Sequence, residues 1–262
     1  MIFDKYFIKG NINKLIINFS DLHYEKDFNN KLLINIISNI KKYKPDYITF
    51  TGDLIDNNKV TYYEYEQVKP LFIFLEQLGL IAPTFICLGN HDLFIPDNIY
   101  NNDFYNNINN INNIYLLRNN SYSYKDISFS AYESPIDFYR NEKHKDIKKE
   151  FNKIKFKYSK TSILLVHSPE MIVENIDIFN KFDIILCGHM HNGLMPHFIK
   201  GTFGLITPKL KLFPKYCRGL KRFNGSTLIT SGGITKLSNT SKKFHKFNFL
   251  YRPQIDLIYI KK

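Results

Sequence analysis

Five apolar runs along this 262-residue chain are each followed closely by Asp, His or Asn side chains. The runs are typical of β-strands and cover residues 15–19, 47–51, 84–88, 163–166 and 182–187. The polar groups are Asp21-x-His23, Gly52-Asp53, Gly89-Asn90-His91-Asp92, His167 and Gly188-His189-x-His191. In an open α/β sheet, ligands gather at the loops that follow the carboxyl ends of the strands. The chain is therefore expected to fold so that these strand ends converge on one site.

Two amphipathic helices are expected between the first three strands. Apolar residues recur at helical spacing from Phe28 to Ile40, and this stripe over residues 28–43 ends before Pro45. A second stripe covers residues 63–78, with Gly79 as the expected C-terminal stop. The alternation of strands and helices predicts a parallel sheet.

The second half of the chain predicts a further sheet. Short alternating runs at 114–131 favour a second, more antiparallel sheet, whereas the charged residues 137–160 are expected to be helical or looped. Strands near 163–166, 182–187, 226–231 and 255–260 complete the pattern. Because no linker rich in Pro, Gly or Ser divides the chain, we expect one domain, residues 1–262, of two facing sheets with helices outside.

The cysteines and the apolar segments bear on the compartment. Cys87, Cys187 and Cys217 form no CxxC pair, and we expect them to be reduced, buried thiols. We find no stretch of about 18 apolar residues and no signal sequence. The expected location is cytoplasmic, with peripheral contact at the inner face of the membrane as a further expectation.

The excess positive charge lies in the C-terminal part of the chain. The net charge is +12, yet residues 184–255 contain twelve Lys or Arg and no Asp or Glu, so the remainder is balanced at 24 against 24. This asymmetry predicts a substrate or partner that carries several negative charges. Within this part, residues 205–223 interleave cations with apolar side chains. They are expected to form either a solvated basic loop or a contact with an anionic membrane or a lipid-linked substrate.

Asp, His and Asn side chains offer oxygen and nitrogen ligands that suit Mn, Fe, Zn, Co or Ni. Two such ions need a bridging carboxylate, and they can hold a hydroxide between them while they neutralise a phosphate. The expected ligands are Asp53 as the bridge, Asp21, His23 and His191 on one metal, and Asn90, His167 and His189 on the other.

The remaining histidines are assigned differently. His91 is expected to act on the substrate, either as a cation that contacts a phosphoryl oxygen or as an acid that protonates the leaving group. Asp56, three residues after the bridge, is expected to orient and charge His91. His144, His197 and His245 are expected to be surface or loop residues.

The motifs together resemble the calcineurin-like metallophosphoesterase superfamily. They are Ser20-Asp21-Leu22-His23, Thr51-Gly52-Asp53-Leu54-Ile55-Asp56, Leu88-Gly89-Asn90-His91-Asp92, Val166-His167 and Cys187-Gly188-His189-Met190-His191. The resemblance implies a four-layer αββα sandwich of two mixed sheets flanked by helices. It also implies the roles given above for these residues.

The C-terminal part resembles a bacterial, membrane-associated branch of that superfamily, which includes UDP-2,3-diacylglucosamine pyrophosphatase-like enzymes. The motifs are Pro214-Lys215-Tyr216-x-Arg218-Gly219-Leu220, Leu228-Ile229-Thr230-Ser231-Gly232-Gly233-Ile234 and Arg252-Pro253-Gln254-Ile255. Three departures are evident. Asn57-Asn58 stand where protein Ser/Thr phosphatases have Arg-Gly, Asn192-Gly193 replace a common Gly-Gly, and no N-terminal anchor is seen.

We therefore expect a divalent-metal-dependent phosphoesterase that cleaves a phosphate ester or pyrophosphate, nucleotide-sugar or lipid-linked, by attack of a metal-bridging hydroxide. A metal-dependent nuclease is one alternative, because a basic face also suits nucleic acid, although no basic-aromatic recognition module is recognised. A non-catalytic scaffold of the same fold is another. The presence of all seven ligands and His91 counts against the scaffold.

Overall fold

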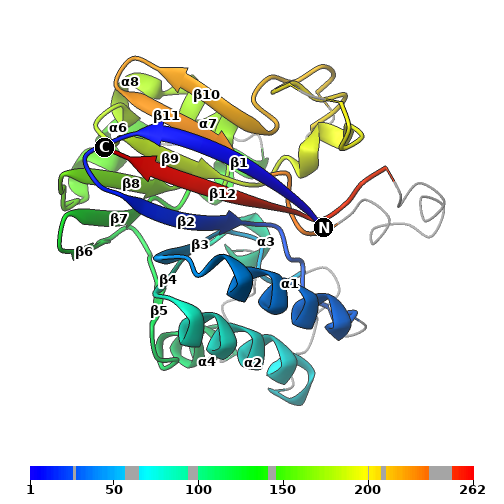
Figure 1. Ribbon diagram of the computed structural model, residues 1–262. Helices are drawn as coiled ribbons and strands as arrows, with labels where there is room; N and C mark the ends of the chain where they lie inside the picture. Colours follow the sequence, from blue (N-terminus) through cyan, green and yellow to red (C-terminus); the bar gives the residue numbers. More distant parts are fainter. Residues whose placement is uncertain are drawn as a thin grey trace.

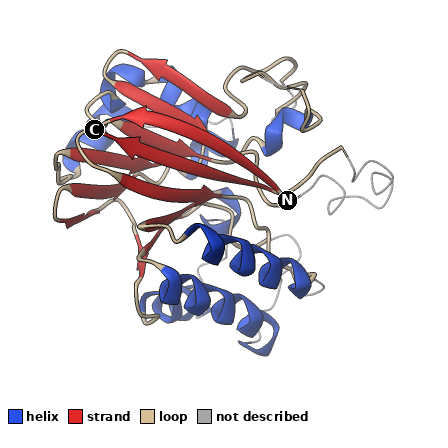
Figure 2. Ribbon diagram, viewed as in Figure 1, coloured by secondary structure: helices blue, strands red, loops and turns tan. Residues whose placement is uncertain are grey.

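The computed structural model describes residues 1–25, 28–56, 65–93, 100–140, 146–199, 201–207, 211–235 and 250–262. Two six-stranded sheets lie face to face, and helices cover their outer sides (Figure 1). Figure 2 shows the strands in the middle of the molecule and the helices on both flanks. The predicted four-layer αββα sandwich of two mixed sheets is confirmed.

The first sheet has the strand order β1-β12-β2-β3-β4-β5. Its strands are β1 (Ile2–Lys9), β12 (Gln254–Lys261), β2 (Lys14–Phe19), β3 (Tyr47–Thr51), β4 (Thr84–Cys87) and β5 (Ile114–Leu116). Only the β12–β2 pair is antiparallel among these strands. The accompanying helices are α1 (Asn30–Tyr43), α2 (Tyr65–Ile81), α3 (Asn90–Leu93) and α4 (Tyr100–Asn109).

The second sheet has the order β10-β11-β9-β8-β7-β6. Its strands are β10 (Gly219–Phe223), β11 (Ser226–Thr230), β9 (Ile184–Cys187), β8 (Thr161–Leu165), β7 (Ile127–Ala131) and β6 (Ser121–Tyr124). The pairs at its two edges are antiparallel and the central pairs are parallel. Short helices follow its strands: α5 (Ile136–Arg140), α6 (Ile147–Lys153), α7 (Pro169–Glu174), α8 (Ile176–Phe179) and the 3₁₀ helix η1 (His191–Leu194).

Three apolar cores separate the four layers. One lies between the first sheet and helices α1, α2 and α4, and a second lies between the second sheet and helices α5 to α8. The third lies between the sheets, where the rings of Phe85 and Phe129 stack with their centroids 4.0 Å apart. The central strands thus bury both faces, which explains why they read as continuous apolar runs.

Helix α1 follows its sequence signals closely. The Asn29 side chain accepts a hydrogen bond from the backbone N–H of Lys31 and caps the helix start. The predicted stripe is buried from Leu33 to Ile40. Lys44 ends the helix in a left-handed conformation directly before Pro45. The predicted helix is confirmed, with its start two residues later than expected.

Three expectations for the elements were wrong or incomplete. Gly79 does not stop α2, which continues to Ile81. A Cβ at Gly79 would lie 2.3 Å from the carbonyl oxygen of Asn112, so close packing against that loop explains the glycine. Residues 114–116 belong to the first sheet as β5, although β6 and β7 do belong to the second. The sequence reading also missed β1 and β10, two edge strands.

Further expectations concern the cysteines and the outlying histidines. All three cysteines are buried free thiols, as predicted. His197 is half-buried in a loop, with Nδ1 2.9 Å from the carbonyl oxygen of Leu250. His144 and His245 lie outside the described residues. Within the described part of the chain, no helix has the length and apolarity that a membrane span requires.

Candidate metal centre

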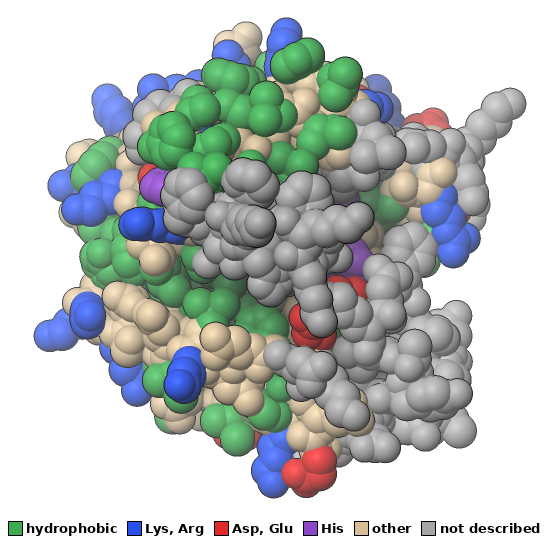
Figure 3. All heavy atoms as spheres, turned by 90° about the vertical axis from the view of Figure 1, so that its right-hand side faces the viewer, with side chains coloured by type: hydrophobic (Ala, Val, Ile, Leu, Met, Phe, Trp, Pro, Cys, Tyr) green, Lys and Arg blue, Asp and Glu red, His purple; other side chains and the backbone are tan. Residues whose placement is uncertain are grey.

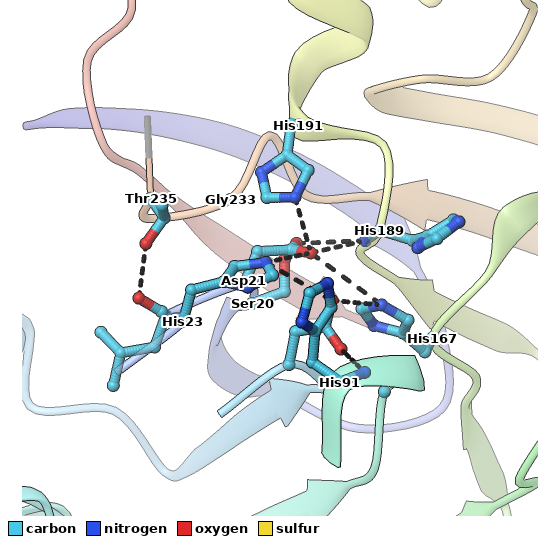
Figure 4. Close-up of polar contacts among 12 residues, drawn as sticks. Ser20, Asp21, His23, His91, His167, His189, His191, Gly233 and Thr235 are labelled. Atoms are coloured by element: carbon cyan, nitrogen blue, oxygen red, sulfur yellow. Dashed lines mark hydrogen bonds and ion pairs between the residues drawn. The ribbon is translucent and has the colours of Figure 1, made fainter. Parts of the chain in front are cut away.

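Five strands deliver the predicted ligands to one place. Asp21 follows β2, Asp53 follows β3, Asn90 follows β4, His167 follows β8, and His189 follows β9. Because the two sheets face each other, the ends of β2, β3 and β4 meet the ends of β8 and β9 there. Figure 4 shows the labelled histidines arranged around Asp21. The fold therefore gathers residues that are up to 170 positions apart, from Asp21 to His191 (191 − 21).

Asp53 lies at the middle of this group. Its Oδ1 accepts a hydrogen bond of 2.9 Å from the backbone N–H of His91. Its Oδ2 lies 3.4 Å from Nε2 of His23 and 3.1 Å from Nε2 of His167. One carboxylate oxygen thus faces imidazoles from both halves of the predicted ligand set.

The remaining ligands form two groups beside Asp53. Donor atoms of Asp21, His23 and His191 all lie within 4.8 Å of one another, and so do those of Asp53, His167 and His189. His189 and His191 therefore diverge from the same turn. The Oδ1 atom of Asn90 is buried and makes no hydrogen bond among the residues the structure describes. A buried amide oxygen without a donor is a fitting ligand for a cation.

The donor set fits divalent metal ions. It consists of carboxylate, imidazole and amide groups, with no thiolate, and it converges with spacings that single cations can span. Its electrostatics also favour a cation. Burial alone would lower the pKa of His167, but Asp53 and Asp21 raise it to about 9. Burial lowers the pKa of His23 to about 3, which leaves this ring in the neutral form that binds a metal.

The backbone at this centre is strained. Asp21, His23, Asp53, His189 and His191 all have positive φ values, between 44° and 70°. For residues other than Gly, such sparsely populated conformations cost on the order of 1–3 kcal/mol each. They persist only where the surrounding structure holds them, so hydrogen bonds to these loops are part of the site.

Asp92 supplies such bonds and was missed as a site residue. Its buried carboxylate accepts hydrogen bonds from the backbone N–H groups of Asp53 (2.8 Å), Leu54 (2.9 Å), Ile55 (3.2 Å) and Gly89 (2.8 Å). Burial raises its pKa to about 7, while the backbone donors favour the ionised form. Asp92 thereby ties the loop of Asp53 to the loop of Asn90. In the sequence, the position of Asp92 in the Gly-Asn-His-Asp motif was the only sign that it belongs to the site.

His91 stands at the edge of the centre. Its ring is half-buried, and Nδ1 lies 3.5 Å from Oδ1 of Asp56. Burial alone would lower the pKa of His91, but Asp56 and Asp53 raise it above its ordinary value. One atom each of His23, Asp53 and His91 also lies within 4.8 Å of the others, so a role as a ligand is geometrically open to His91.

The cations of segment 205–223 are not all exposed. Arg218 is buried, and its guanidinium donates hydrogen bonds to the carbonyl oxygens of Gly201 (3.1 Å) and Pro196 (3.4 Å). It stabilises the loop and is not available to an external anion. Residues 208–210 of this segment, and Asn57-Asn58 of the sequence comparison, lie outside the described residues.

Comparisons with known proteins show which family the sequence matches. A sequence model of the family described as "Calcineurin-like phosphoesterase" matches residues 14–193, which include every predicted ligand and both other site residues. The uncharacterized metallophosphoesterase YkuE of Bacillus subtilis is 29% identical over 251 residues, which cover 94% of this chain and 78% of that protein.

Two further relatives match over shorter lengths. An uncharacterized metallophosphoesterase of Campylobacter jejuni is 26% identical over 185 residues, 68% of this chain. The matched region spans only 44% of that relative's own length. UDP-2,3-diacylglucosamine pyrophosphatase LpxG of Chlamydia muridarum is 36% identical over 77 residues, 29% of this chain and 22% of that protein.

Proposed function

This chain belongs to the calcineurin-like phosphoesterase family, and from that premise we propose that it hydrolyses a phosphate ester or pyrophosphate at a centre of two divalent metals. The observation that carries the proposal is the position of Asp53, whose Oδ2 faces His23 on one side and His167 on the other. That arrangement suits a bridging carboxylate between two ions. The other ligands divide between the two sides of this bridge.

Each residue is then given a role. Asp21, His23 and His191 would hold the first ion, Asn90, His167 and His189 would hold the second, and Asp53 would bind both. Bound there, the ions supply a nucleophile by lowering the pKa of water and neutralise the charge of the phosphate. Their identity is left among Mn, Fe, Zn, Co and Ni.

His91 acts on the substrate. Asp56 lies within reach of Nδ1 and raises the pKa of the ring, so that His91 presents a positive charge or a proton at the mouth of the centre. The positive charge suits a phosphoryl oxygen, and the proton suits a departing alkoxide. Protonation of a leaving group by a positioned acid contributes about 10²- to 10⁴-fold. Asp56 is a positioning residue in this scheme.

The substrate is expected to be an anionic phosphate compound. A nucleotide-sugar pyrophosphate is the leading candidate, since the short match to LpxG points to that class. The test is metal analysis of the purified protein, followed by hydrolysis of simple phosphodiesters, nucleotide-sugar pyrophosphates, and single-stranded and duplex DNA. Cleavage of DNA alone would favour a nuclease, and protein purified without metal that takes up none would favour the scaffold.

We also propose that the stretches on either side of the Ile206–Leu212 bridge contact an anionic membrane. Within the predicted 205–223 segment, Leu205, Leu212 and Phe213 expose 45%, 69% and 72% of their surface. Phe198 and Phe203, just outside the predicted bounds, expose 60% and 48%. Figure 3 views the molecule from the right-hand side of Figure 1 and shows hydrophobic side chains gathered in the upper part of that face. We name these five side chains the apolar rim.

The segment that carries Leu205 and Leu212 is hydrogen-bonded to the helix that begins at a proposed metal ligand. An isolated bridge pairs Ile206 with Leu212, and the backbone N–H of Leu205 donates to the carbonyl of Gly193 in η1, the helix that begins at His191. Exposed Lys215 adds positive charge beside the apolar rim, and exposed Lys211 lies there too, with its Nζ 3.9 Å from Oε1 of Glu170. Apolar side chains could enter a bilayer while each cation meets lipid phosphate, at about 1 kcal/mol per cation.

Vesicle sedimentation tests the membrane contact. The protein is expected to bind vesicles of phosphatidylserine more than vesicles of phosphatidylcholine, and to be released by salt. Leu212→Ser and Phe213→Ser should each weaken binding. Leu80→Ser is the matched control, because Leu80 is 75% exposed on α2, away from the rim. Equal binding to both vesicle types, or none at low salt, would contradict the proposal.

A further inference from the structure

The space between the two sheets becomes polar where it approaches the metal ligands. On β12, Ile258 and Ile260 point into the apolar core between the sheets. Successive side chains of a strand alternate between its faces, so Asp256 and Gln254 occupy the same face nearer the centre. Both are buried, with exposures of 0% and 3%. The proposed catalytic scheme makes no use of this buried carboxylate.

Hydrogen bonds hold Asp256 and its neighbours in one arrangement. Asp256 accepts from Nε2 of Gln254 at 2.8 Å and from Nδ2 of Asn18 at 3.1 Å. The amide oxygen of Asn18 accepts in turn from the hydroxyl of Thr49 at 2.9 Å. Burial raises the pKa of Asp256 to about 7, and the hydrogen bonds from Gln254 and Asn18 oppose this rise. The cluster joins β12 to β2 and β3 directly below the ligands.

Residues 231–235, a loop that follows β11, lie between this cluster and Asp21. The backbone N–H of Gln254 donates to the carbonyl of Gly233 at 3.0 Å. Gly232 packs so tightly that a Cβ there would lie 2.1 Å from Oε1 of Gln254. On the other side, a Cβ at Gly233 would lie 3.1 Å from Cβ of Asp21. The loop is thus seated on Gln254 and abuts the metal ligand.

The same loop binds the backbone of the first ligand motif. The N–H groups of Ile234 and Thr235 donate to the carbonyls of Ser20 and Asp21, both at 2.9 Å. The hydroxyl of Thr235 donates to the carbonyl of Leu22 (Figure 4). Asp21 has φ 55°, so these bonds hold a conformation that the backbone would leave if unconstrained.

We propose that Gln254 and Asp256 are positioning residues of the metal centre, which act through loop 231–235 to hold Asp21 where it binds its ion. The inference rests on the proposed function, since it concerns the first of the two proposed metal positions. Strand β12 carries no proposed ligand, yet under this proposal it controls the metal affinity of the first position.

Two variants remove the support without touching a proposed ligand. Asp256→Leu keeps the side-chain size and leaves the amides of Gln254 and Asn18 without their acceptor. Gln254→Met keeps the backbone bond to Gly233 and loses only the amide, so it serves if Asp256→Leu does not fold. Ile258→Ala is the control, because it opens a cavity in the same strand and on the same face, two residues farther from the loop.

Titration of metal-free protein with Co²⁺, followed by its visible absorption, gives the affinities of both positions. Asp256→Leu and Gln254→Met should each weaken one of the two Co²⁺ ions about tenfold, which corresponds to 1.4 kcal/mol, the scale of one buried hydrogen bond. The position weakened should be the one lost in Asp21→Asn. In metal-free protein, amide exchange at Ile234 and Thr235 should accelerate in both variants.

The control separates positioning from stability. Ile258→Ala should lower the melting temperature while both Co²⁺ affinities stay within about twofold, well inside the tenfold step of 1.4 kcal/mol. Unchanged affinities in Asp256→Leu and Gln254→Met, or an equal loss in Ile258→Ala, would overturn the inference and leave the proposed metal centre standing. Failure of the unmodified protein to bind two Co²⁺ would overturn both.

Discussion

Asp92→Asn tests whether backbone support holds the Asp53 loop. One oxygen of Asp92 accepts from Asp53 and Gly89, and the other accepts from Leu54 and Ile55. In asparagine one of these atoms becomes an NH₂ group, which cannot accept. Two buried N–H groups then lose their partner, at about 1–3 kcal/mol each, for a total of about 2–6 kcal/mol.

The expected effect is large enough to measure in metal-free protein. For a chain of this size, 1 kcal/mol shifts the melting temperature by about 2–4 °C, so a fall of about 4 °C or more is expected. The substitution also removes a negative charge beside Asp53, which offsets part of the lost free energy of unfolding. The fall of about 4 °C, which comes from the lower end of the expected range, is therefore used as the threshold. Calorimetry in the presence of a chelator gives the value without any contribution from bound metal.

A matched control shows whether the effect belongs to this site. Asp126→Asn makes the same chemical change at a carboxylate whose side chain is 56% exposed and pairs with Lys160. A surface pair of this kind contributes about 0–1 kcal/mol, so this variant should stay close to the unmodified protein. If Asp92→Asn melts within about 1 °C of Asp126→Asn, well below the expected shift, the reasoning about the four backbone bonds is wrong.

Four further variants address the proposed centre. Asp53→Asn should lose activity and most of the bound metal, and stoichiometric metal with normal turnover would remove Asp53 as the bridge. His91→Ala should keep both metals and lose on the order of 10²- to 10⁴-fold in rate, with a smaller loss in Asp56→Asn; metal loss like that of Asp53→Asn would make His91 a ligand. Gly89→Ala should lower metal content, because the added Cβ would lie 2.2 Å from Oδ1 of Asp53, and retention of full metal content would show that the loop can yield.

Much of the fold could be predicted because its signals are local. Apolar runs, the stripe of α1 and its stop before Pro45 depend on neighbouring residues, and the structure follows them. Edge strand β1 was missed because seven of its eight residues are partly buried or exposed and its pattern is mixed. Gly79 was misread because the reason for a glycine there lies in a loop more than thirty residues away.

In the candidate site, too, features with local sequence signals could be predicted, and features that depend on distant residues could not. The proposed ligands could be identified because each follows a strand and each side chain has the chemistry of a metal ligand. The proposed supporting residues could not, because their partners become neighbours only in the folded chain. Asp92 accepts from the backbone N–H of Asp53, and Asp256 accepts from the side-chain amide of Asn18. The burial of Arg218, one of the cations of the 205–223 segment, could not be predicted either, because nothing near it in sequence shows that its guanidinium donates to two carbonyls.

Because β12 lies between β1 and β2, the proposed metal centre can be completed only after β12 has been synthesised. Asn18 and Asp256 are hydrogen-bonded across 238 positions, and Thr235 reaches Leu22 across 213. A growing chain that has already released all seven proposed ligands therefore still lacks the loop that holds Asp21 and the strand behind it. Contacts of such separation close slowly. The ribosome must deliver the chain as far as β12 before the first proposed ligand is secured, so metal uptake at that ligand is expected only after β12 has been synthesised.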